Sequence, residues 1–358
     1  MKKIGIMTMH RIINYGSYLQ AYALKKIIEN ITDAKVEFID YKFGEVLVDF
    51  VGKKSFFDKI HENRTITSYL KKKSFIRNNQ KSYELYLQDL GVFERNYNHD
   101  IDLLVIGSDE VFNCMQGYPV GYSKNLFGES YEDIKTISYA GSFGHTTVED
   151  LKKYMIFDEI KTMFYKFAFI SVRDNNSKIV LNEMGFEVYK HLDPVLVYDF
   201  CRDVKNPTID IKDYIIVYAY TGRLSVAERK SIKLFAKRHK KKIVSIGYYS
   251  DIADYNIVCN PLEVFGYFKN ADYIITDTFH GTVFSIKMNS KFCTIIRDSN
   301  KNKINDLLRT LEQQDRIAYC IEDIERLYNI EVDFEQTNTI IQERKQQTIA
   351  YLKLAINS

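Results

Sequence analysis

The sequence has 358 residues, of which 46% are hydrophobic and 27% charged, and its formal net charge at pH 7 is +3. This composition is typical of a globular protein of two ordinary domains or one large one, and it excludes a globally basic nucleic-acid-binding protein. The five scattered cysteines form no CxxC pair, which indicates reduced thiols and neither a disulfide framework nor a zinc site. The sequence shows no secretory signal and no run of roughly 18 apolar residues, so we expect a cytoplasmic protein.

The first part of the chain alternates short apolar strands with helical patterns. Strands are predicted at 2–9, 35–41, 101–107, 136–143 and 167–172. Helices are predicted at 17–30, over about 147–165 and at 174–185, and the stretch 189–197 turns at Asp193-Pro194. The run at 101–107 is almost continuously apolar, which is typical of a strand buried on both faces of a parallel sheet.

A second series of the same kind begins near residue 213. Its strands are predicted at 213–220, 241–248, 272–277 and 291–297, and its helices at 224–240, 261–269 and 281–289. Alternating strands and helices indicate parallel sheets covered by helices on both faces. We therefore predict an α/β protein with two Rossmann-like domains facing each other across a cleft. The domains are residues 1–200, with a basic helical insertion at 45–98, and residues 201–330, followed by a helical tail at 331–358.

Ligands of such sheets bind beyond the carboxyl ends of the strands, where this chain carries glycines, small hydroxyls and charged groups. The candidates are His10, Asn14, Tyr15, Gly16, Ser17, Gly107, Ser108, Asp109, Asn113, Gly141, Ser142, Gly144, Arg173, Thr278, His280, Gly281 and Thr282. A glycine lets backbone N–H groups approach a ligand, and a helix N-terminus favours an anion. Arg173 can bind a carboxylate or phosphate through its planar fork, and His280 can move a proton near neutral pH.

Each candidate also has an ordinary structural interpretation. The glycines can serve the turns alone, Asp109 can cap a helix, Arg173 can pair with an acid, and His280 can be a satisfied core residue. Their shared position at strand ends favours a site, because these ends meet on one rim of the sheets.

Six stretches resemble the polysaccharide pyruvyl transferase family and occur in that family's order. They are NYGSYLQAYAL (14–24), LLVIGSDEVFN (103–113), ISYAGSFG (137–144), ISVRD (170–174), LDPV (192–195) and ADYIITDTFHGTVFSI (271–286). The resemblance implies a glycosyltransferase-B-like fold. It also implies transfer of a pyruvyl group from phosphoenolpyruvate to two hydroxyls of a glycan sugar, which forms a ketal in surface or capsular polysaccharide biosynthesis.

The resemblance also implies roles for particular residues. His280 acts as an acid or neutralises the leaving phosphate, and Arg173 anchors the donor anion. The implied substrate-binding residues are Asn14, Tyr15, Gly16, Gly107, Ser108, Asp109, Ser142, Thr278, Gly281 and Thr282. Some members of the family carry an arginine where this chain has Thr278, so a second anchor is expected from Lys287, Arg297 or backbone N–H groups. Gln20 is expected to brace the NYG loop, and no metal or cofactor is expected beside the donor phosphoenolpyruvate.

A basic segment from Lys53 to Lys81 carries nine Lys or Arg residues against Asp58 and Glu62. Aromatic and aliphatic residues are interleaved with these charges. One interpretation is a solvated helical pair that packs an apolar stripe on the body. The other is peripheral contact with anionic lipid at the inner face of the plasma membrane, where a lipid-linked oligosaccharide or polysaccharide acceptor would be met.

Two other functions remain open at this stage. A nucleotide-sugar glycosyltransferase on the same fold needs diphosphate and base recognition in the second domain. No obvious acidic ribose-binding residue follows a strand of that domain, unless Asp251 or Asp277 has this role. A non-catalytic partner in glycan assembly would keep the fold alone. A classical dehydrogenase is disfavoured, because residues 3–16 contain no GxGxxG.

Overall fold

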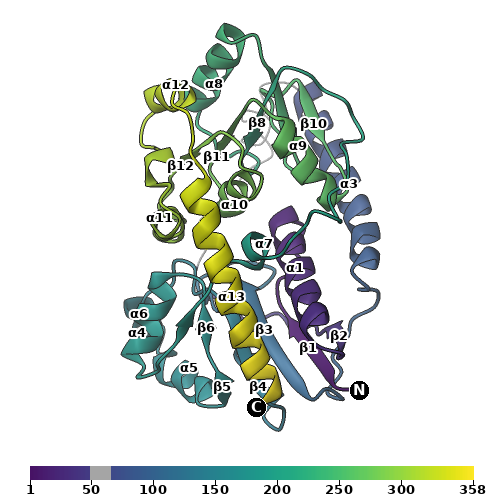
Figure 1. Ribbon diagram of the computed structural model, residues 1–358, viewed down its shortest axis with the longest axis vertical. Helices are drawn as coiled ribbons and strands as arrows, with labels where there is room; N and C mark the ends of the chain where they lie inside the picture. The colour runs from purple at the N-terminus through teal and green to yellow at the C-terminus, as the bar shows by residue number, and fades with distance from the viewer. Residues whose placement is uncertain (49–65) are drawn as a thin grey trace.

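The computed structural model describes residues 1–48 and 66–358, so the part of the basic segment from 53 to 65 lies outside the described residues. Two parallel sheets lie one above the other, each flanked by helices (Figure 1). None of the helices in the described residues has the length and apolar character needed to cross a bilayer.

The first sheet has the order β2-β1-β3-β4-β6-β7, and β5 also pairs with β4. Its strands are β1 (Lys3–Met7), β2 (Lys35–Phe38), β3 (Leu103–Asp109), β4 (Thr136–Gly141), β5 (Phe167–Phe169), β6 (Ser171–Val172) and β7 (Tyr189–Lys190). Its helices are α1 (Tyr15–Ile31), α3 (Ile66–Asp89), α4 (Val148–Lys153), α5 (Phe157–Phe164), α6 (Asn175–Glu183) and α7 (Pro194–Val197). Every residue of β3 and β4 is buried, as their continuous apolar pattern predicts.

The second sheet has the order β10-β9-β8-β11-β12-β13. Its strands are β8 (Tyr214–Tyr218), β9 (Lys242–Ile246), β10 (Tyr255–Ile257), β11 (Tyr273–Thr276), β12 (Phe292–Ile295) and β13 (Ile317–Ala318). The helices that follow in the chain are α8 (Val226–Arg238), α9 (Val264–Asn270), α10 (Phe279–Lys287), α11 (Lys301–Thr310), α12 (Glu322–Tyr328) and α13 (Glu335–Asn357). All strand pairs in both sheets are parallel, so the predicted α/β class is confirmed.

One predicted helix is wrong in its length. The stretch 147–165 contains two helices, α4 and α5, because Met155 between them has a left-handed backbone with φ of 57°. Thr147 caps α4 by accepting a hydrogen bond from the Asp150 N–H, while the Asp150 carboxylate accepts one from the Thr147 N–H. A left-handed residue cannot continue a right-handed helix, so the chain starts a new one.

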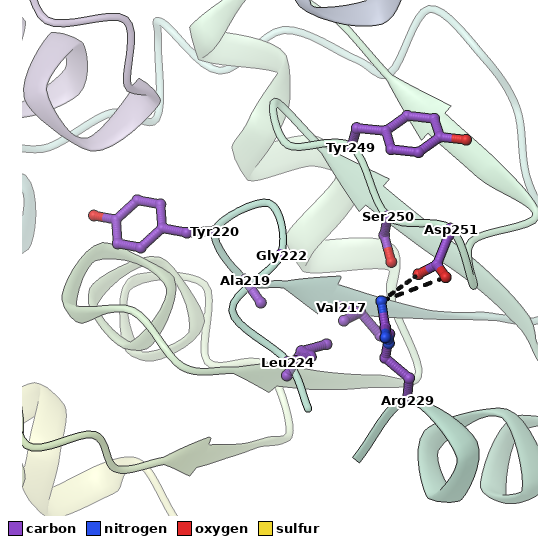
Figure 2. A pocket seen from close by; sticks show the side chains of 9 residues that line it. All are labelled: Val217, Ala219, Tyr220, Gly222, Leu224, Arg229, Tyr249, Ser250 and Asp251. Atoms are coloured by element: carbon purple, nitrogen blue, oxygen red, sulfur yellow. Dashed lines mark hydrogen bonds and ion pairs between the residues drawn. The ribbon is translucent and has the colours of Figure 1, made fainter. Parts of the chain in front are cut away.

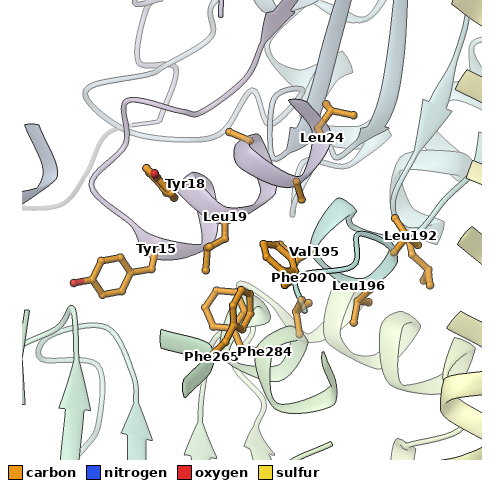
Figure 3. Close-up of a cluster of buried hydrophobic side chains, with 14 of the residues drawn as sticks. Tyr15, Tyr18, Leu19, Leu24, Leu192, Val195, Leu196, Phe200, Phe265 and Phe284 are labelled. Atoms are coloured by element: carbon orange, nitrogen blue, oxygen red, sulfur yellow. The ribbon is translucent and has the colours of Figure 1, made fainter. Parts of the chain in front are cut away.

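The two domains share a hydrophobic core, and Figure 3 shows where α1 and α7 meet the second domain. Leu19 and Val195 from the first domain belong to the same buried cluster as Phe265 and Phe284 from the second. The Tyr15 hydroxyl crosses this boundary as well, donating to the Cys259 carbonyl (2.9 Å) and accepting from its N–H (3.1 Å). A site at this boundary is therefore held by packing from both sides.

The last helix returns to the first domain. α13, yellow in Figure 1, runs from the second domain down along the first, and its end lies close to the N-terminus. The Tyr351 hydroxyl donates to the Ser138 carbonyl (2.6 Å), and the Tyr139 hydroxyl lies 3.1 Å from that of Thr348. The later part of α13 is thus packed against the first sheet through buried contacts, whereas Thr337 near its start donates to the Leu311 carbonyl (2.9 Å) in the second domain.

The helix α3 belongs to the basic insertion and contacts both domains. The Tyr83 hydroxyl donates to the Asn14 carbonyl (3.1 Å), and the Asn79 amide donates to the Gly247 carbonyl (3.0 Å) in the second domain. Leu70 and Ile76, on the other hand, remain exposed. Part of α3 therefore packs on the body, and part of its apolar surface faces outward.

Candidate functional site

A cavity of about 270 Å³ opens between the domains. The first domain contributes Asn14, Ser17, Asp109, Glu110 and Arg173 to its lining, and the second domain contributes Tyr220, Phe279, His280 and Lys303. Both residues implied as catalytic, Arg173 and His280, therefore line one cavity at the carboxyl ends of the two sheets. This is where the strand-end rule places a ligand.

His280 lies in the first turn of α10, directly after the buried strand β11. Thr278 caps this helix, since its hydroxyl accepts a hydrogen bond from the Gly281 N–H (2.9 Å). Gly16 lies behind the imidazole, and a Cβ atom built there would be 2.1 Å from both Cγ and Nδ1 of His280. The first turn of α1 and the first turn of α10 thus fix the imidazole between them.

Arg173 follows β6 and is almost completely buried. Its Nη1 donates to Oδ2 of Asp193 (2.8 Å), its Nη2 lies 3.7 Å from Oδ1 of Asp109, and its guanidinium lies 4.2 Å from the centre of the Phe279 ring. Burial disfavours the charge, but the Asp193 and Asp109 carboxylates outweigh it and raise the pKa of Arg173 above its ordinary value. The site therefore contains a permanent buried cation.

Asp193 connects the two catalytic candidates. Its Oδ2 lies 2.8 Å from Nη1 of Arg173 and 3.6 Å from Nε2 of His280. Burial alone would raise the pKa of this carboxyl, but the nearby His280 and Arg173 and the Val195 N–H outweigh it and lower the pKa below its ordinary value. Asp193 was not among the predicted site residues, although it lies in the matching stretch LDPV just after a strand.

Three buried nitrogens of this group have no hydrogen-bond partner in the structure. They are Nε and Nη2 of Arg173 and Nε2 of His280. Buried donors are nearly always paired, so unpaired ones call for an explanation. An anion bound in the cavity would supply acceptors for them.

The predicted substrate-binding residues fall into separate groups. Asn14 and Asp109 line the cavity, and Asp109 accepts a hydrogen bond from the Ser17 hydroxyl (2.8 Å). Asp109 also has φ of 75°, a left-handed conformation that is uncommon outside glycine and is enriched at functional sites. Tyr15, by contrast, does not line the cavity, since its hydroxyl is held by Cys259.

The remaining predicted residues stabilise the strand ends and do not line the cavity. Ser108 donates to the Ala140 carbonyl (2.8 Å), Ser142 donates to Asp174, and Thr282 donates to the Thr278 carbonyl (3.0 Å). A Cβ atom on Gly107 would lie 2.2 Å from the Tyr139 carbonyl oxygen, so this position has no room for a side chain. Thr278 and Gly281 form the cap of α10, and these residues therefore shape the site without lining it.

Gln20 ties α1 to the end of β1. Its side-chain amide donates to the Thr8 hydroxyl and to the Ser17 carbonyl, both at 2.9 Å. The amide thus fixes the first turn of α1, which carries Gly16 and Ser17, against the strand end.

A sequence model of the polysaccharide pyruvyl transferase family matches residues 14–299. The two residues that the resemblance implies as catalytic, Arg173 and His280, line this cavity. The chain belongs to this family. The resemblance read from the six stretches is thereby confirmed. Among curated proteins, none matches this sequence.

Solved structures with the same fold are distant in sequence from this pyruvyl transferase family member. S. aureus MnaA in a co-structure with UDP has a TM-score of 0.53 and 12% identity, over 100% of this chain and 97% of that chain. The Methanocaldococcus jannaschii UDP-GlcNAc 2-epimerase in complex with UDP-GlcNAc and UDP has a TM-score of 0.50 and 12% identity, over 99% and 100%. At such identity the likeness shows the fold alone, and the predicted glycosyltransferase-B-like arrangement is confirmed.

The cations expected to supply a second anchor in this family member do not line the cavity. Lys287, at the far end of α10, donates to the carbonyls of Leu196 (2.9 Å) and Tyr198 (2.6 Å). Arg297 binds Asp277 (3.2 Å) and Glu228 (2.7 Å). The cavity contains Lys303 instead, which no local sequence signal marked.

The crevice above β8 and β9 in the second domain is nearly filled. Figure 2 shows its lining, where Arg229 reaches Asp251 at 3.4 Å, and the enclosed volume is about 20 Å³. Such a volume holds about one water molecule. Asp251 lines this crevice and is paired with Arg229, whereas Asp277 is fully buried beside Arg297 and lines no part of it.

The described residues hold no group of three or more His, Cys, Asp or Glu side chains placed to bind a metal ion. The Lys and Arg side chains among the described residues that line the cavity are Arg173 and Lys303.

Proposed function

We propose that this protein transfers the pyruvyl group of phosphoenolpyruvate to two hydroxyls of a glycan sugar and forms a cyclic ketal. The observation that carries the proposal is the convergence of Arg173 and His280 on Asp193 at an interdomain cavity with unpaired buried donors. Phosphoenolpyruvate carries a carboxylate and a phosphate, so its site needs cationic or N–H-rich anchors. Membership of the pyruvyl transferase family supports the same class of reaction.

In the proposed reaction the methylene carbon of the donor takes a proton, which leaves cationic character at the carbon that bears the phosphate. The two sugar oxygens bond to that carbon in turn, and its bond to the phosphate oxygen breaks. Of the two hydroxyl protons, one balances the new methyl group and the other leaves with phosphate. The products are the ketal and inorganic phosphate.

His280 is the proton donor in this scheme. Its Nε2 has no hydrogen-bond partner and lies 3.6 Å from the Asp193 carboxylate, which orients the ring. Arg173 binds the donor anion through Nε and Nη2, because its Nη1 is occupied by Asp193. The N-terminus of α10 adds backbone N–H groups and a favourable helix dipole.

Asp109 acts on the acceptor side. Its carboxylate lines the cavity and is held by the Ser17 hydroxyl, so it can accept a hydrogen bond from an incoming sugar hydroxyl. The acceptor is a lipid-linked oligosaccharide or a growing polysaccharide, and the enzyme works in the cytoplasm on its precursors.

The test is phosphate release from phosphoenolpyruvate by the purified protein. It is run with lipid-linked acceptors that contain galactose, glucose or N-acetylmannosamine. His280→Ala and Arg173→Ala are compared with the matched variants His239→Ala and Arg229→Ala, whose side chains lie outside the cavity. Acceptor-dependent release that the first pair abolishes and the second pair retains supports the proposal.

Two negative outcomes of this test would favour different functions. No release and no phosphoenolpyruvate binding by calorimetry, together with binding of a UDP-sugar, would favour a nucleotide-sugar glycosyltransferase. No binding of either donor would favour a non-catalytic partner in glycan assembly.

A peripheral membrane contact is a second part of the proposal. α3 exposes Leu70 and Ile76 next to the exposed lysines Lys71 and Lys73. Basic residues interleaved with apolar ones favour binding to anionic lipid headgroups. Such binding would hold the enzyme where lipid-linked acceptors occur.

A further inference from the structure

Lys303 brings a second cation to the cavity from the other domain. It lies on α11, and its ammonium forms an ion pair with the carboxylate of Glu110, which follows β3 in the first domain. Both residues line the cavity, so the pair spans the boundary between the domains at the candidate site. The pair is therefore in reach of a ligand that enters there.

The two cations of the cavity are arranged around one aromatic side chain. The Lys303 Nζ lies 5.7 Å from the centre of the Phe279 ring, and the Arg173 guanidinium lies 4.2 Å from the same centre. Phe279 immediately precedes His280 in the first turn of α10. Among the described residues that line the cavity, Arg173 and Lys303 are the Lys and Arg side chains.

The two ion pairs differ in how the carboxylate is held. Asp193, the partner of Arg173, is completely buried and also faces His280. Glu110, the partner of Lys303, keeps 24% of its side chain exposed and has a second partner, the Asn113 amide (2.7 Å). Glu110 can therefore give up Lys303, meet solvent and keep the hydrogen bond from Asn113. Asp193 also accepts a hydrogen bond from the Val195 N–H (3.0 Å), but without Arg173 it would remain a charge with no access to solvent.

We propose that Lys303 is the second cationic anchor for the anionic donor, and that Glu110 occupies its ammonium until the donor displaces that carboxylate. The identity of the donor rests on the proposed function, whereas the ability of Lys303 to bind an anion does not. A phosphate dianion attracts the ammonium more strongly than a carboxylate at the same distance, which favours the exchange. Glu110 then acts as a competitor of the donor, so removal of its charge should strengthen binding.

The test is calorimetric titration of the full chain with phosphoenolpyruvate and, separately, with inorganic phosphate as a bare dianion. Lys303→Gln should weaken binding about 10- to 100-fold, as expected for loss of one charge-assisted contact. Glu110→Gln should tighten binding. Lys190→Gln is the matched control, because Lys190 makes another ion pair with α11, to Asp306 (2.8 Å), and does not line the cavity.

Lys303→Gln and Glu110→Gln are expected to change the affinity in opposite directions, which distinguishes an anchor from an ion pair that only holds the domains together. Equal weakening by Lys303→Gln, Glu110→Gln and Lys190→Gln would overturn the proposal, because such an ion pair is broken from either side. Lys303→Arg keeps the charge and should retain binding, which shows that a loss in Lys303→Gln is not misfolding.

The titration with inorganic phosphate distinguishes the proposal that Lys303 is an anchor from the proposal that phosphoenolpyruvate is the donor. Phosphate binding that depends on Lys303, in a protein that does not bind phosphoenolpyruvate, would uphold the anchor and overturn the proposed donor. If the protein binds phosphoenolpyruvate and Lys303→Gln leaves that binding unchanged, the proposed donor is upheld and the anchor is overturned. Wild type that binds neither anion would overturn both.

Discussion

The imidazole of His280 lies against the backbone of Gly16, where a Cβ atom would be 2.1 Å from Cγ and Nδ1 of the ring. Gly16 lies within the first turn of α1 and is not required by a turn. The glycine in the NYG stretch is there because the histidine of the other domain needs its space.

Gly16→Ala should therefore damage catalysis by displacing His280. A misplacement of about 1 Å is enough for a loss of about 100-fold in kcat/KM, which steady-state phosphate release would measure. The control is the double variant with His280→Ala, compared with the single variants by urea unfolding, because His280→Ala itself abolishes phosphate release. The alanine at position 16 should cost nothing further there, since the ring it displaces is absent. Additive losses would mean that Gly16 acts by another route.

Arg173→Lys tests the planar fork of the guanidinium separately from its charge. The lysine keeps a cation beside Asp193 but loses the second donor and the stacking on Phe279. We expect kcat/KM for phosphoenolpyruvate to fall about 10- to 100-fold while the thermal unfolding midpoint changes little. Unchanged kinetics would show that Arg173 serves only to neutralise Asp193.

Tyr15→Phe distinguishes packing from substrate binding. Loss of the hydroxyl leaves the Cys259 backbone groups without their partner and should destabilise the protein by about 1–2 kcal/mol in urea unfolding. The kinetic constants should stay within about threefold, because Tyr15 does not line the cavity. Tyr255→Phe, at a partly exposed position, is the control. Activity loss without destabilisation would restore Tyr15 as a substrate-binding residue.

The Glu110–Lys303 pair should make stability depend on acidity. Burial would raise the pKa of Glu110, but the Lys303 ammonium and the hydrogen bonds from Lys303 and Asn113 outweigh it and lower the pKa from 4.5 to about 2. A carboxyl with a lowered pKa stabilises the fold above its unfolded-state pKa, and that contribution disappears as the pH falls through its folded-state value.

The unfolding free energies of wild type and Glu110→Gln should therefore differ at neutral pH. The difference should shrink as the pH falls from about 4.5 toward 2, because the wild-type carboxyl becomes neutral as well. Urea unfolding at a series of pH values measures both curves. Parallel curves over this range would mean that the ion pair adds nothing to folding.

The basic surface of α3 predicts binding to anionic vesicles. Wild type should pellet with vesicles that contain phosphatidylserine and not with neutral ones, and salt should weaken the binding. Lys71/Lys72/Lys73→Glu reverses the local charge and should abolish pelleting. A matched triple change of Lys233, Lys237 and Lys240, near α8, should not. Equal pelleting of wild type and the α3 variant would contradict the membrane contact.

Much of the fold and part of the site are local properties of the sequence. Apolar runs such as 101–107 and 272–277 predict buried parallel strands. A strand covered by helices on both faces of its sheet needs apolar side chains at successive positions, and a near-continuous apolar run supplies them. Parallel strands end on one rim, so the residues after them, Arg173 and His280, were expected to meet, and both line the cavity.

The sequence by itself thus determined the α/β class and the family, and it singled out two residues, Arg173 and His280, that line the cavity. Tertiary structure alone decided that Asp193 joins them, that Tyr15 packs away from the cavity, and that Lys303 reaches Glu110 across 193 positions of the chain. It also decided that α13 returns to the first domain. Strand and helix patterns depend on neighbours a few residues apart. These contacts join residues far apart in the chain and depend on how the two domains pack together, which local periodicity does not predict.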